Sequence, residues 1–239
     1  MTNEDILLKS FKKLYALYKK EKFVIDKSGV KVIELIDHHI SNLNPKQPYL
    51  DFGVRKTNED YVKKESNWYN SQSLSINGYV DDVKIWKQVA DKDGLVNSNY
   101  GWCIYSKDNY NQYENCLHEL EKNQYSRRAC MIYNRPSMQI DYCKNGMSDF
   151  ICTFSTQQFI RNNKLYYIVN MRSNDSIFGF GNDFAWHCEV YNKLYNDLKK
   201  TYPKLKYGKI HWNAGSFHIY ERHFDLLKDI CETFKSKKG

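Results

Sequence analysis

The chain has 239 residues, of which 41% are hydrophobic and 15% aromatic, and its formal net charge is +8. This length and apolar content are sufficient for one sizeable core and exclude a disordered chain. The positive charge admits nucleic acids, membranes or small anions as partners, but the lysines are scattered and favour a solvated surface over a binding stripe. With four prolines and no low-complexity linker, residues 1–239 are expected to form a single domain.

The cysteine pattern bears on metals and on the compartment. Seven cysteines show no CxxC pair and no metal-ligand spacing, and their number is odd. No signal peptide precedes the first predicted helix, and no apolar run reaches about eighteen residues. We therefore expect a cytoplasmic protein with reduced cysteines, no bound metal and no membrane segment.

The N-terminal part of the chain predicts a helix followed by a hairpin. Apolar residues at helical spacing indicate a helix over residues 3–20, with Thr2 or Asn3 as its N-cap. Residues 23–36 then predict a strand, a turn and a second strand, with the bend at 27–29.

A second helix is predicted over residues 57–69, with Trp68 and Tyr69 on its apolar side. Glu65 lies one turn from these two rings. A glutamate is usually exposed. Burial against aromatic rings would instead raise its pKa and suit it to acid–base chemistry.

Two shorter segments follow. Residues 84–90 predict a short helix that contains Ile85 and Trp86, both of which could be ordinary core residues. Residues 97–102 predict a glycine-containing turn that carries Tyr100.

A helix that starts at the capping residue Asp108 and a strand over residues 129–133 come next. Arg127 and Arg128 lie between them. Two adjacent arginines are weak evidence for anion binding, and a charged strand edge is an equally good interpretation.

The central stretch holds the main chemical candidates. Cys152 is followed by a strand over residues 165–170, by Arg-Ser-Asn-Asp at 172–175, and by Phe-Gly-Phe-Gly-Asn-Asp at 178–183. A helix is predicted from Phe184 to Tyr202. A candidate nucleophile, an anion-binding arginine and a carboxylate within one strand–helix unit indicate a nucleotide site.

The C-terminal part predicts a strand over residues 209–220 and a helix over residues 224–234. Period-two alternation in the strand places His218 and Tyr220 on the same side. A pair of this kind is more often structural than functional.

Taken together, these motifs resemble the thymidylate synthase family. That family has a cysteine, an Arg-Ser-x-Asp motif about twenty residues later, then Leu-Gly-x-Pro-Phe-Asn and finally His-x-Tyr. The family's last Asn of the third motif is Asp183 here. This replacement, with NSNYGW, SRR, RPSMQ and GMSDF, resembles the branch that hydroxymethylates deoxycytidylate in T-even-type bacteriophages. The resemblance covers about residues 21–225.

The resemblance implies an α/β (α+β) protein of the thymidylate synthase fold, with a mixed β-sheet flanked by helices, acting as a homodimer in the infected host's cytoplasm. It implies dCMP as substrate, 5,10-methylenetetrahydrofolate as cosubstrate and 5-hydroxymethyl-dCMP as product. It also implies composite sites, in which Arg127 and Arg128 reach the partner subunit's nucleotide phosphate. No metal, membrane or direct nucleic-acid partner is expected.

Roles for individual residues follow from the same resemblance. The implied catalytic residues are Cys152, which attacks C6 of the pyrimidine, Glu65, which manages protons and water, Tyr100 beside the cysteine, and Asp183. The implied nucleotide-binding residues are Lys27, Arg127, Arg128, Arg172, Ser173, His218 and Tyr220. The implied folate-binding residues are Ile85, Trp86, Asp175 and Gly179. Arg172 could serve twice, by lowering the thiol pKa and by binding phosphate.

Asp183 is expected to select the base. Cytosine offers an acceptor at N3 and a donor at N4, and a protonated carboxyl can donate to the first and accept from the second. Uracil offers the reverse pattern, which suits an amide. Alternatively, Asp183 could cap the helix that follows, a role that Asn182 could fill equally well.

Several alternatives stay open at this point. The reaction could be methylation rather than hydroxymethylation, and the substrate could be dUMP or CMP. A rival of another class is a basic nucleic-acid-binding protein without catalysis. The chain ends Phe234-Lys-Ser-Lys-Lys-Gly239, without the apolar tail with which the synthases close over folate. How the site closes over folate therefore stays an open question. The absence of an apolar tail would fit a site that admits water. Neither the rate nor membership of a larger assembly follows from the sequence.

Overall fold

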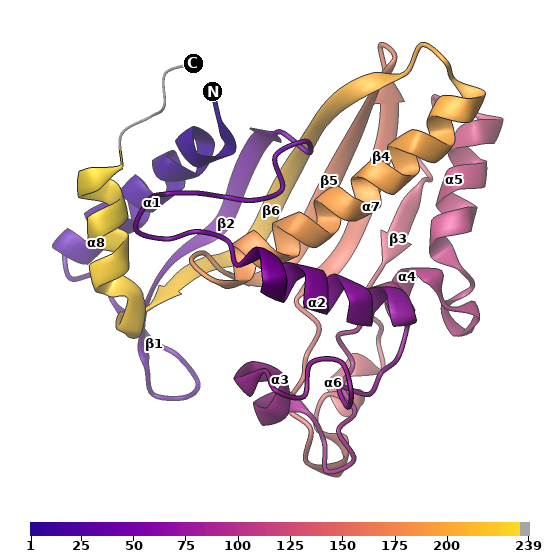
Figure 1. Cartoon of the computed structure of the whole chain (residues 1–239). Coiled ribbons are helices and arrows are strands. Elements are labelled where there is room, and N and C mark those ends of the chain that lie inside the picture. The colour runs from indigo at the N-terminus through magenta and orange to yellow at the C-terminus, as the bar shows by residue number, and fades with distance from the viewer. Residues whose placement is uncertain (235–239) are drawn as a thin grey trace.

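One six-stranded β-sheet organises the chain, with strands in the order β1-β2-β6-β5-β4-β3 (Figure 1). The computed structural model describes residues 1–234. The β5–β6 pair is parallel and the other neighbours are antiparallel, so the sheet is mixed, as expected. The strands are β1 (Val24–Ile25), β2 (Lys31–Leu43), β3 (Cys130–Ile132), β4 (Thr153–Arg161), β5 (Lys164–Asp175) and β6 (Lys206–Tyr220).

Three helices pack against the sheet. Helix α1 lies over β2, α5 lies over β3 and β4, and α7 lies over β5. The 23-residue helix α7 runs diagonally across the sheet, with α2 in front of one end (Figure 1). The helices within residues 1–234 are α1 (Asn3–Lys19), α2 (Glu59–Ser71), α3 (Lys84–Val89), α4 (Tyr100–Tyr105), α5 (Gln112–Lys122), α6 (Met138–Asp141), α7 (Gly179–Thr201) and α8 (Phe224–Thr233).

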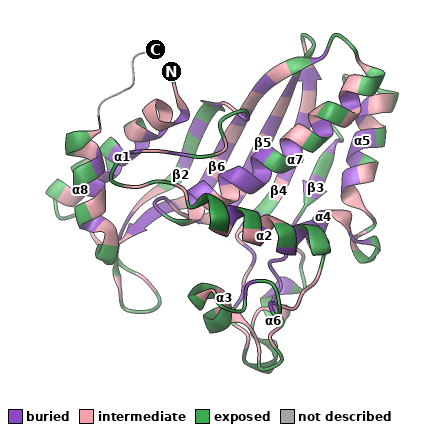
Figure 2. Ribbon diagram, viewed as in Figure 1, coloured by how far each residue is buried: buried purple, intermediate pink, exposed green. Residues whose placement is uncertain are grey.

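Within the described residues, helices cover one face of the sheet. On β5, Leu165, Tyr167 and Val169 are fully buried, whereas the residues between them are partly exposed (Figure 2). On the other face, Ile132 of β3 is 50% exposed and Phe154 of β4 is 44% exposed. Side chains alternate between the two faces of a strand, so the second face is left open in the isolated chain.

Most predicted elements are present, but two helix starts and one predicted turn were wrong. The helix predicted from Asp108 begins at Gln112, because the Asn111 side chain caps it by accepting from the backbone of Glu114. Asp108 lies in a short 3-10 turn instead. The segment expected to be a turn around Tyr100 forms helix α4. The helix predicted from Phe184 begins earlier, at Gly179. The question of an apolar C-terminal tail concerns residues 235–239, which lie outside the described residues.

Candidate active site

Cys152 and Arg172 lie side by side at one end of the sheet, as the sequence predicted. Arg172 is on β5, and its backbone N–H donates to the Cys152 carbonyl at 2.8 Å. Its guanidinium donates to the Cys152 Sγ at 3.5 Å. The same guanidinium donates to the carbonyls of Phe150 and Ile151 at 2.6 and 3.0 Å, which fixes its position.

Burial raises the pKa of the Cys152 thiol to about 11, and the negative charges of Asp183 and Asp149 act in the same direction. The positive charge of Arg172 opposes this rise, in the sense that the sequence suggested. In the free chain, however, burial outweighs it. The thiol is therefore protonated at neutral pH in the free chain.

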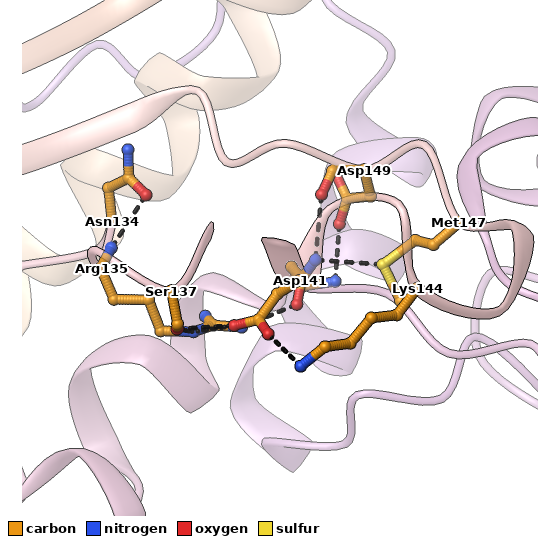
Figure 3. A network of polar contacts seen from close by, with 8 residues as sticks. Asn134, Arg135, Ser137, Asp141, Lys144, Met147 and Asp149 are labelled. Atoms are coloured by element: carbon orange, nitrogen blue, oxygen red, sulfur yellow. Dashed lines mark hydrogen bonds and ion pairs between the residues drawn. The ribbon is translucent and has the colours of Figure 1, made fainter. Parts of the chain in front are cut away.

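A buried carboxylate braces the segment that leads to Cys152, and this feature was missed from the sequence. Asp149 accepts from the backbone N–H groups of Asn97 and Ser98, both at 2.7 Å, and from the Ser98 hydroxyl at 2.7 Å. Arg135 extends the network, donating to Asn97 at 2.7 Å and pairing with Asp141 at 3.0 Å (Figure 3). This network fixes the cysteine segment relative to the start of α4, the helix that carries Tyr100. In the sequence, the two sides of this network lie in the motifs GMSDF, which contains Asp149, and NSNYGW, which begins with Asn97 and Ser98.

Glu65 is buried, with 6% of its surface exposed, and faces aromatic groups. Its Oε1 accepts from the Tyr61 hydroxyl at 2.6 Å and from the Trp86 indole at 3.2 Å. Burial raises the pKa of Glu65 to about 7, and these hydrogen bonds oppose the rise. The conditional prediction from the sequence, that burial against aromatic rings would raise this pKa, is confirmed.

Tyr100 stacks on Tyr69 with ring centroids 5.2 Å apart. Gly101 makes this contact possible, because a Cβ at Gly101 would lie 1.8 Å from the Tyr69 carbonyl oxygen. Burial raises the pKa of Tyr100 well above its ordinary value, and the charges of Asp183 and Cys152 add to the rise. The Tyr100 hydroxyl thus lies among the candidate catalytic groups.

Asp183 lies within helix α7, not at its start. The N-cap position of α7 is occupied by Phe178, so the interpretation of Asp183 or Asn182 as the cap is wrong. Asp183 Oδ2 accepts from the Asn174 side-chain amide at 3.0 Å. Burial raises the pKa of Asp183 well above its ordinary value, and the charges of Glu65 and Asp175 raise it further. The surroundings of Asp183 therefore favour the neutral form of its carboxyl.

The candidate folate residues divide between two elements. Asp175 Oδ1 accepts from the backbone N–H groups of Ile177 and Phe178 at 2.9 and 3.3 Å, and so shapes the turn into α7. Gly179 opens that helix, and a Cβ there would lie 3.3 Å from the Asp175 Cβ. On α3, Ile85 is 53% exposed and is not a core residue. Trp86 is partly buried, and its ring meets the ring of Trp68 edge-on with centroids 4.9 Å apart.

The nucleotide-binding candidates of β5 and β6 share the same end of the sheet. Ser173 pairs with Ser216, and Asp175 pairs with His218. The His218 and Tyr220 rings contact each other with centroids 5.1 Å apart, which confirms that they point to the same side. Lys27 is exposed on the β1–β2 turn. β1 pairs with the start of β2, next to Tyr220.

Arg127 and Arg128 do not join this group within one chain. The register pairs Cys130 with Gln157, so Arg128 continues towards Phe159 on β4. At roughly 3.4 Å per residue, this position lies about 24 Å along the strand from Cys152. Both arginines are exposed, and Arg128 pairs with Glu119 at 3.1 Å.

Within residues 1–234, no group of three His, Cys, Asp or Glu side chains could hold a metal ion. All seven cysteines are free. In the same part of the chain, no helix combines the length and the apolar character needed to cross a membrane.

A family model described as Thymidylate synthase matches residues 13–237, so the chain belongs to the thymidylate synthase family. It is 48% identical to the deoxycytidylate 5-hydroxymethyltransferase of Enterobacteria phage T6, over 98% of this chain and 92% of that protein. It is 47% identical to the enzyme of the same name from Enterobacteria phage T4, over 100% of this chain and 95% of that protein. A thymidylate synthase of Bacillus subtilis subsp. natto is 31% identical over 61% of this chain and 51% of that protein. The resemblance to the family and to its T-even-type branch is confirmed.

Proposed function

We propose that the chain is a deoxycytidylate 5-hydroxymethyltransferase, which converts dCMP, 5,10-methylenetetrahydrofolate and water to 5-hydroxymethyl-dCMP and tetrahydrofolate. The full-length similarity to the phage T6 and T4 enzymes supports this activity. The single structural observation that carries it is Asp183. Its raised pKa supplies the donor and acceptor that the cytosine edge requires, at the position where the synthases have an amide.

Cys152 is proposed as the nucleophile. Its thiolate adds to C6 of the pyrimidine, and the electron pair of the C5–C6 double bond moves to C5. C5 then attacks the one-carbon unit. Loss of the C5 proton and of the folate carrier leaves an exocyclic methylene on C5. Water adds to that methylene, and expulsion of Cys152 from C6 restores the ring.

The folate cosubstrate supplies the one-carbon unit when it is bound. The residues present fit such a ligand, because exposed Ile85 offers an apolar surface next to the partly buried Trp86 ring. Across the site, Gly179 adds no side chain at the start of α7 beside Asp175. We assign these four residues to the folate and pterin contacts.

Glu65 is proposed to position the water that distinguishes hydroxymethylation from methylation. Its pKa of about 7 allows it to accept or donate a proton near neutral pH. The hydroxyl of Tyr61 and the indole of Trp86 both donate to Oε1 and hold the carboxyl in one orientation. Tyr100 completes the polar wall beside Cys152.

A homodimer with shared sites is proposed for the phosphate. Arg172, Ser173 and Lys27 are at the Cys152 end of the sheet, whereas Arg127 and Arg128 lie about 24 Å away at 3.4 Å per residue. The open sheet face carries exposed apolar groups, and we assign it as the surface on which two subunits pair. Pairing of two such faces would carry the arginines of one subunit to the phosphate of the other. His218 and Tyr220 are assigned to the sugar.

Product mass is the test of the activity. The protein is incubated with 5,10-methylenetetrahydrofolate and either dCMP or dUMP, and the nucleotide mass is measured. A hydroxymethyl adduct of dCMP is expected, and it differs from a methyl adduct by one oxygen. A methyl product, or turnover of dUMP alone, would contradict the proposal. Salt-dependent DNA binding without any nucleotide turnover would instead favour the non-enzymatic alternative.

A further inference from the structure

Asn174 is buried between Trp212 and Asp183, with 2% of its surface exposed. Its Oδ1 accepts from the Trp212 indole at 3.2 Å, and its Nδ2 donates to Asp183 Oδ2 at 3.0 Å. An indole N–H can only donate. The amide oxygen must therefore face Trp212, and the amide NH₂ must face Asp183. The orientation of the amide is thus dictated by the indole.

This orientation makes the two oxygens of Asp183 different. Oδ2 receives the N–H of Asn174, and a carboxyl oxygen that receives such a donor is favoured as the carbonyl oxygen. The proton of the neutral carboxyl is then favoured on Oδ1. Tyr100 also hydrogen-bonds the Asp183 side chain, and its hydroxyl can either donate to the carboxyl or accept a proton from it. Asp183 consequently offers one donor, at Oδ1, and a remaining lone pair, at Oδ2. A cytosine edge, with an acceptor at N3 and a donor at N4, matches that pattern. A uracil edge does not.

We propose that Asn174, held by Trp212, is a positioning residue that sets the proton position on Asp183 and thereby favours cytosine over uracil. Asn174 acts through Asp183 and does not itself contact the base. This inference rests on the proposed function, because it assumes that Asp183 faces the pyrimidine. Asn174 is 38 positions away from Trp212 in the sequence, and the two side chains meet because β5 and β6 are neighbouring strands.

Asn174→Asp tests the inference by reversing the polarity of the contact. The new carboxylate accepts from Trp212 and also from Asp183, so it draws the carboxyl proton to Oδ2. Oδ1 then faces N3 of cytosine as an acceptor. The ratio of dissociation constants for dUMP and dCMP, measured by titration of the protein, should fall by about tenfold or more. Asn174→Leu removes the N–H donor to Asp183 but puts no acceptor in its place. The ratio of dissociation constants should therefore fall less than in Asn174→Asp.

The infrared carbonyl band of Asp183 gives a second readout that needs no nucleotide. The band is assigned by difference from Asp183→Asn. It should shift to higher frequency in Asn174→Leu, because the carbonyl oxygen loses its hydrogen bond. This measurement separates the inference from the proposed function. If the wild-type protein fails to convert dCMP, the function fails, while an Asn174-dependent band still supports the proton position.

Gln158→Leu is the matched control, since Gln158 is a fully buried amide on the same covered sheet face. Its side chain bonds Thr156 and Cys116, away from the site. It reports the effect of replacing a buried amide by leucine and should change neither the dissociation-constant ratio nor the band. A purely structural role of Asn174 would weaken dCMP and dUMP binding equally. An unchanged ratio in Asn174→Asp, or an unchanged band in Asn174→Leu, would overturn the inference.

Discussion

At the scale of single residues, the chemistry of the candidate site depends on which of its acidic side chains are protonated. Cys152, Glu65 and Asp183 all have raised pKa values in the free chain, with burial as the largest cause. Burial thus favours the neutral form of each group, and three anions in one small site would also repel one another. With a pKa of about 7, Glu65 is the one of the three that is poised to change its charge near neutral pH.

Cys152→Ser should lower turnover of dCMP by more than about a thousandfold, because loss of a nucleophile is among the most costly active-site changes. Binding of dCMP should change little, since the phosphate and sugar contacts stay in place. Release of tritium from C5 of dCMP is the assay. Cys143→Ser, at an exposed cysteine, is the control and should retain activity. Activity of Cys152→Ser within about tenfold of the wild type would contradict the assignment.

Asp183→Asn should shift preference from dCMP towards dUMP. The amide can donate to O4 and accept from N3–H of uracil, but it cannot supply a proton to N3 of cytosine. A buried mismatch of about 1–3 kcal/mol corresponds to roughly 5- to 150-fold on binding. The quantity to measure is the ratio of kcat/KM for the two nucleotides. A ratio equal to that of the wild type in a folded variant would show that Asp183 does not read the base.

Glu65→Gln should change how stability depends on pH. The folded-state pKa of Glu65 is raised from 4.5 to about 7, so the folded chain keeps a proton that the unfolded chain has lost. Stability of the wild type should therefore fall as pH rises from about 4.5 to 7, by on the order of 3 kcal/mol. The glutamine side chain of the variant does not ionise, so this part of the fall should disappear.

Urea unfolding of the unliganded protein at pH 5 and pH 8 measures this effect. The difference between the two pH values should be smaller in Glu65→Gln than in the wild type. Glu59→Gln, at an exposed residue in the first turn of the same helix, is the control and should keep the wild-type difference. Equal pH dependence in Glu65→Gln and the wild type would show that Glu65 is ionised in the folded chain.

At the scale of elements, close backbone approach joins α4 to α2. Gly101→Ala should destabilise the fold, because the new Cβ would lie 1.8 Å from the Tyr69 carbonyl oxygen and the two helices must separate. The expected loss is at least about 1–3 kcal/mol, and activity should fall because Tyr100 moves away from Cys152. Thermal unfolding and turnover of dCMP are the measurements.

Gly78→Ala is the control for that substitution. Gly78 has open space around its Cβ position but a φ of +77°. Alanine there incurs only the cost of the left-handed backbone, about 1 kcal/mol, and leaves α4 in place. If Gly101→Ala costs no more than Gly78→Ala and keeps full turnover, the approach of α4 to α2 is not what positions Tyr100.

The sequence predicted the strands and helices that have strong periodicity and the residues that lie in spaced motifs. It singled out Cys152, Arg172 and Asp183 as candidates because each belongs to a short local pattern. It missed Asn174, whose orientation is imposed by Trp212 from a neighbouring strand, and Asp149, whose partners lie about fifty residues earlier. It also started α7 too late, because the glycines at its first turn resemble a loop when only the local propensity is considered.

At the scale of the whole molecule, the open sheet face and the separation of the proposed phosphate ligands both agree with the proposed homodimer. The covered face is filled by α1, α5 and α7, whereas Ile132 and Phe154 on the other face stay half-exposed. A monomer would leave this apolar surface in water. A two-fold pairing of sheets would bury it and would bring Arg127 and Arg128 towards the partner's Cys152 end.

Subunit mixing tests this arrangement. An Arg128→Ala chain and a Cys152→Ala chain should each be nearly inactive, because every site of either homodimer lacks one group. In a heterodimer, one site receives both defects and the other site receives none. Refolding equal amounts together gives half heterodimers if pairing is random, so about a quarter of the wild-type activity should return.

Both the control and the outcome that would contradict the proposal require proof that heterodimers have formed. Heterodimers are counted by tagging one chain and capturing the pair. Mixing Cys152→Ala with Asp183→Ala is the control, because both residues belong to the same subunit's site. In that heterodimer, each site keeps one defect, so no activity should return. If the first mixture also stays inactive although heterodimers form, each site is built from a single chain. Arg127 and Arg128 would then have no role in the partner's phosphate contact.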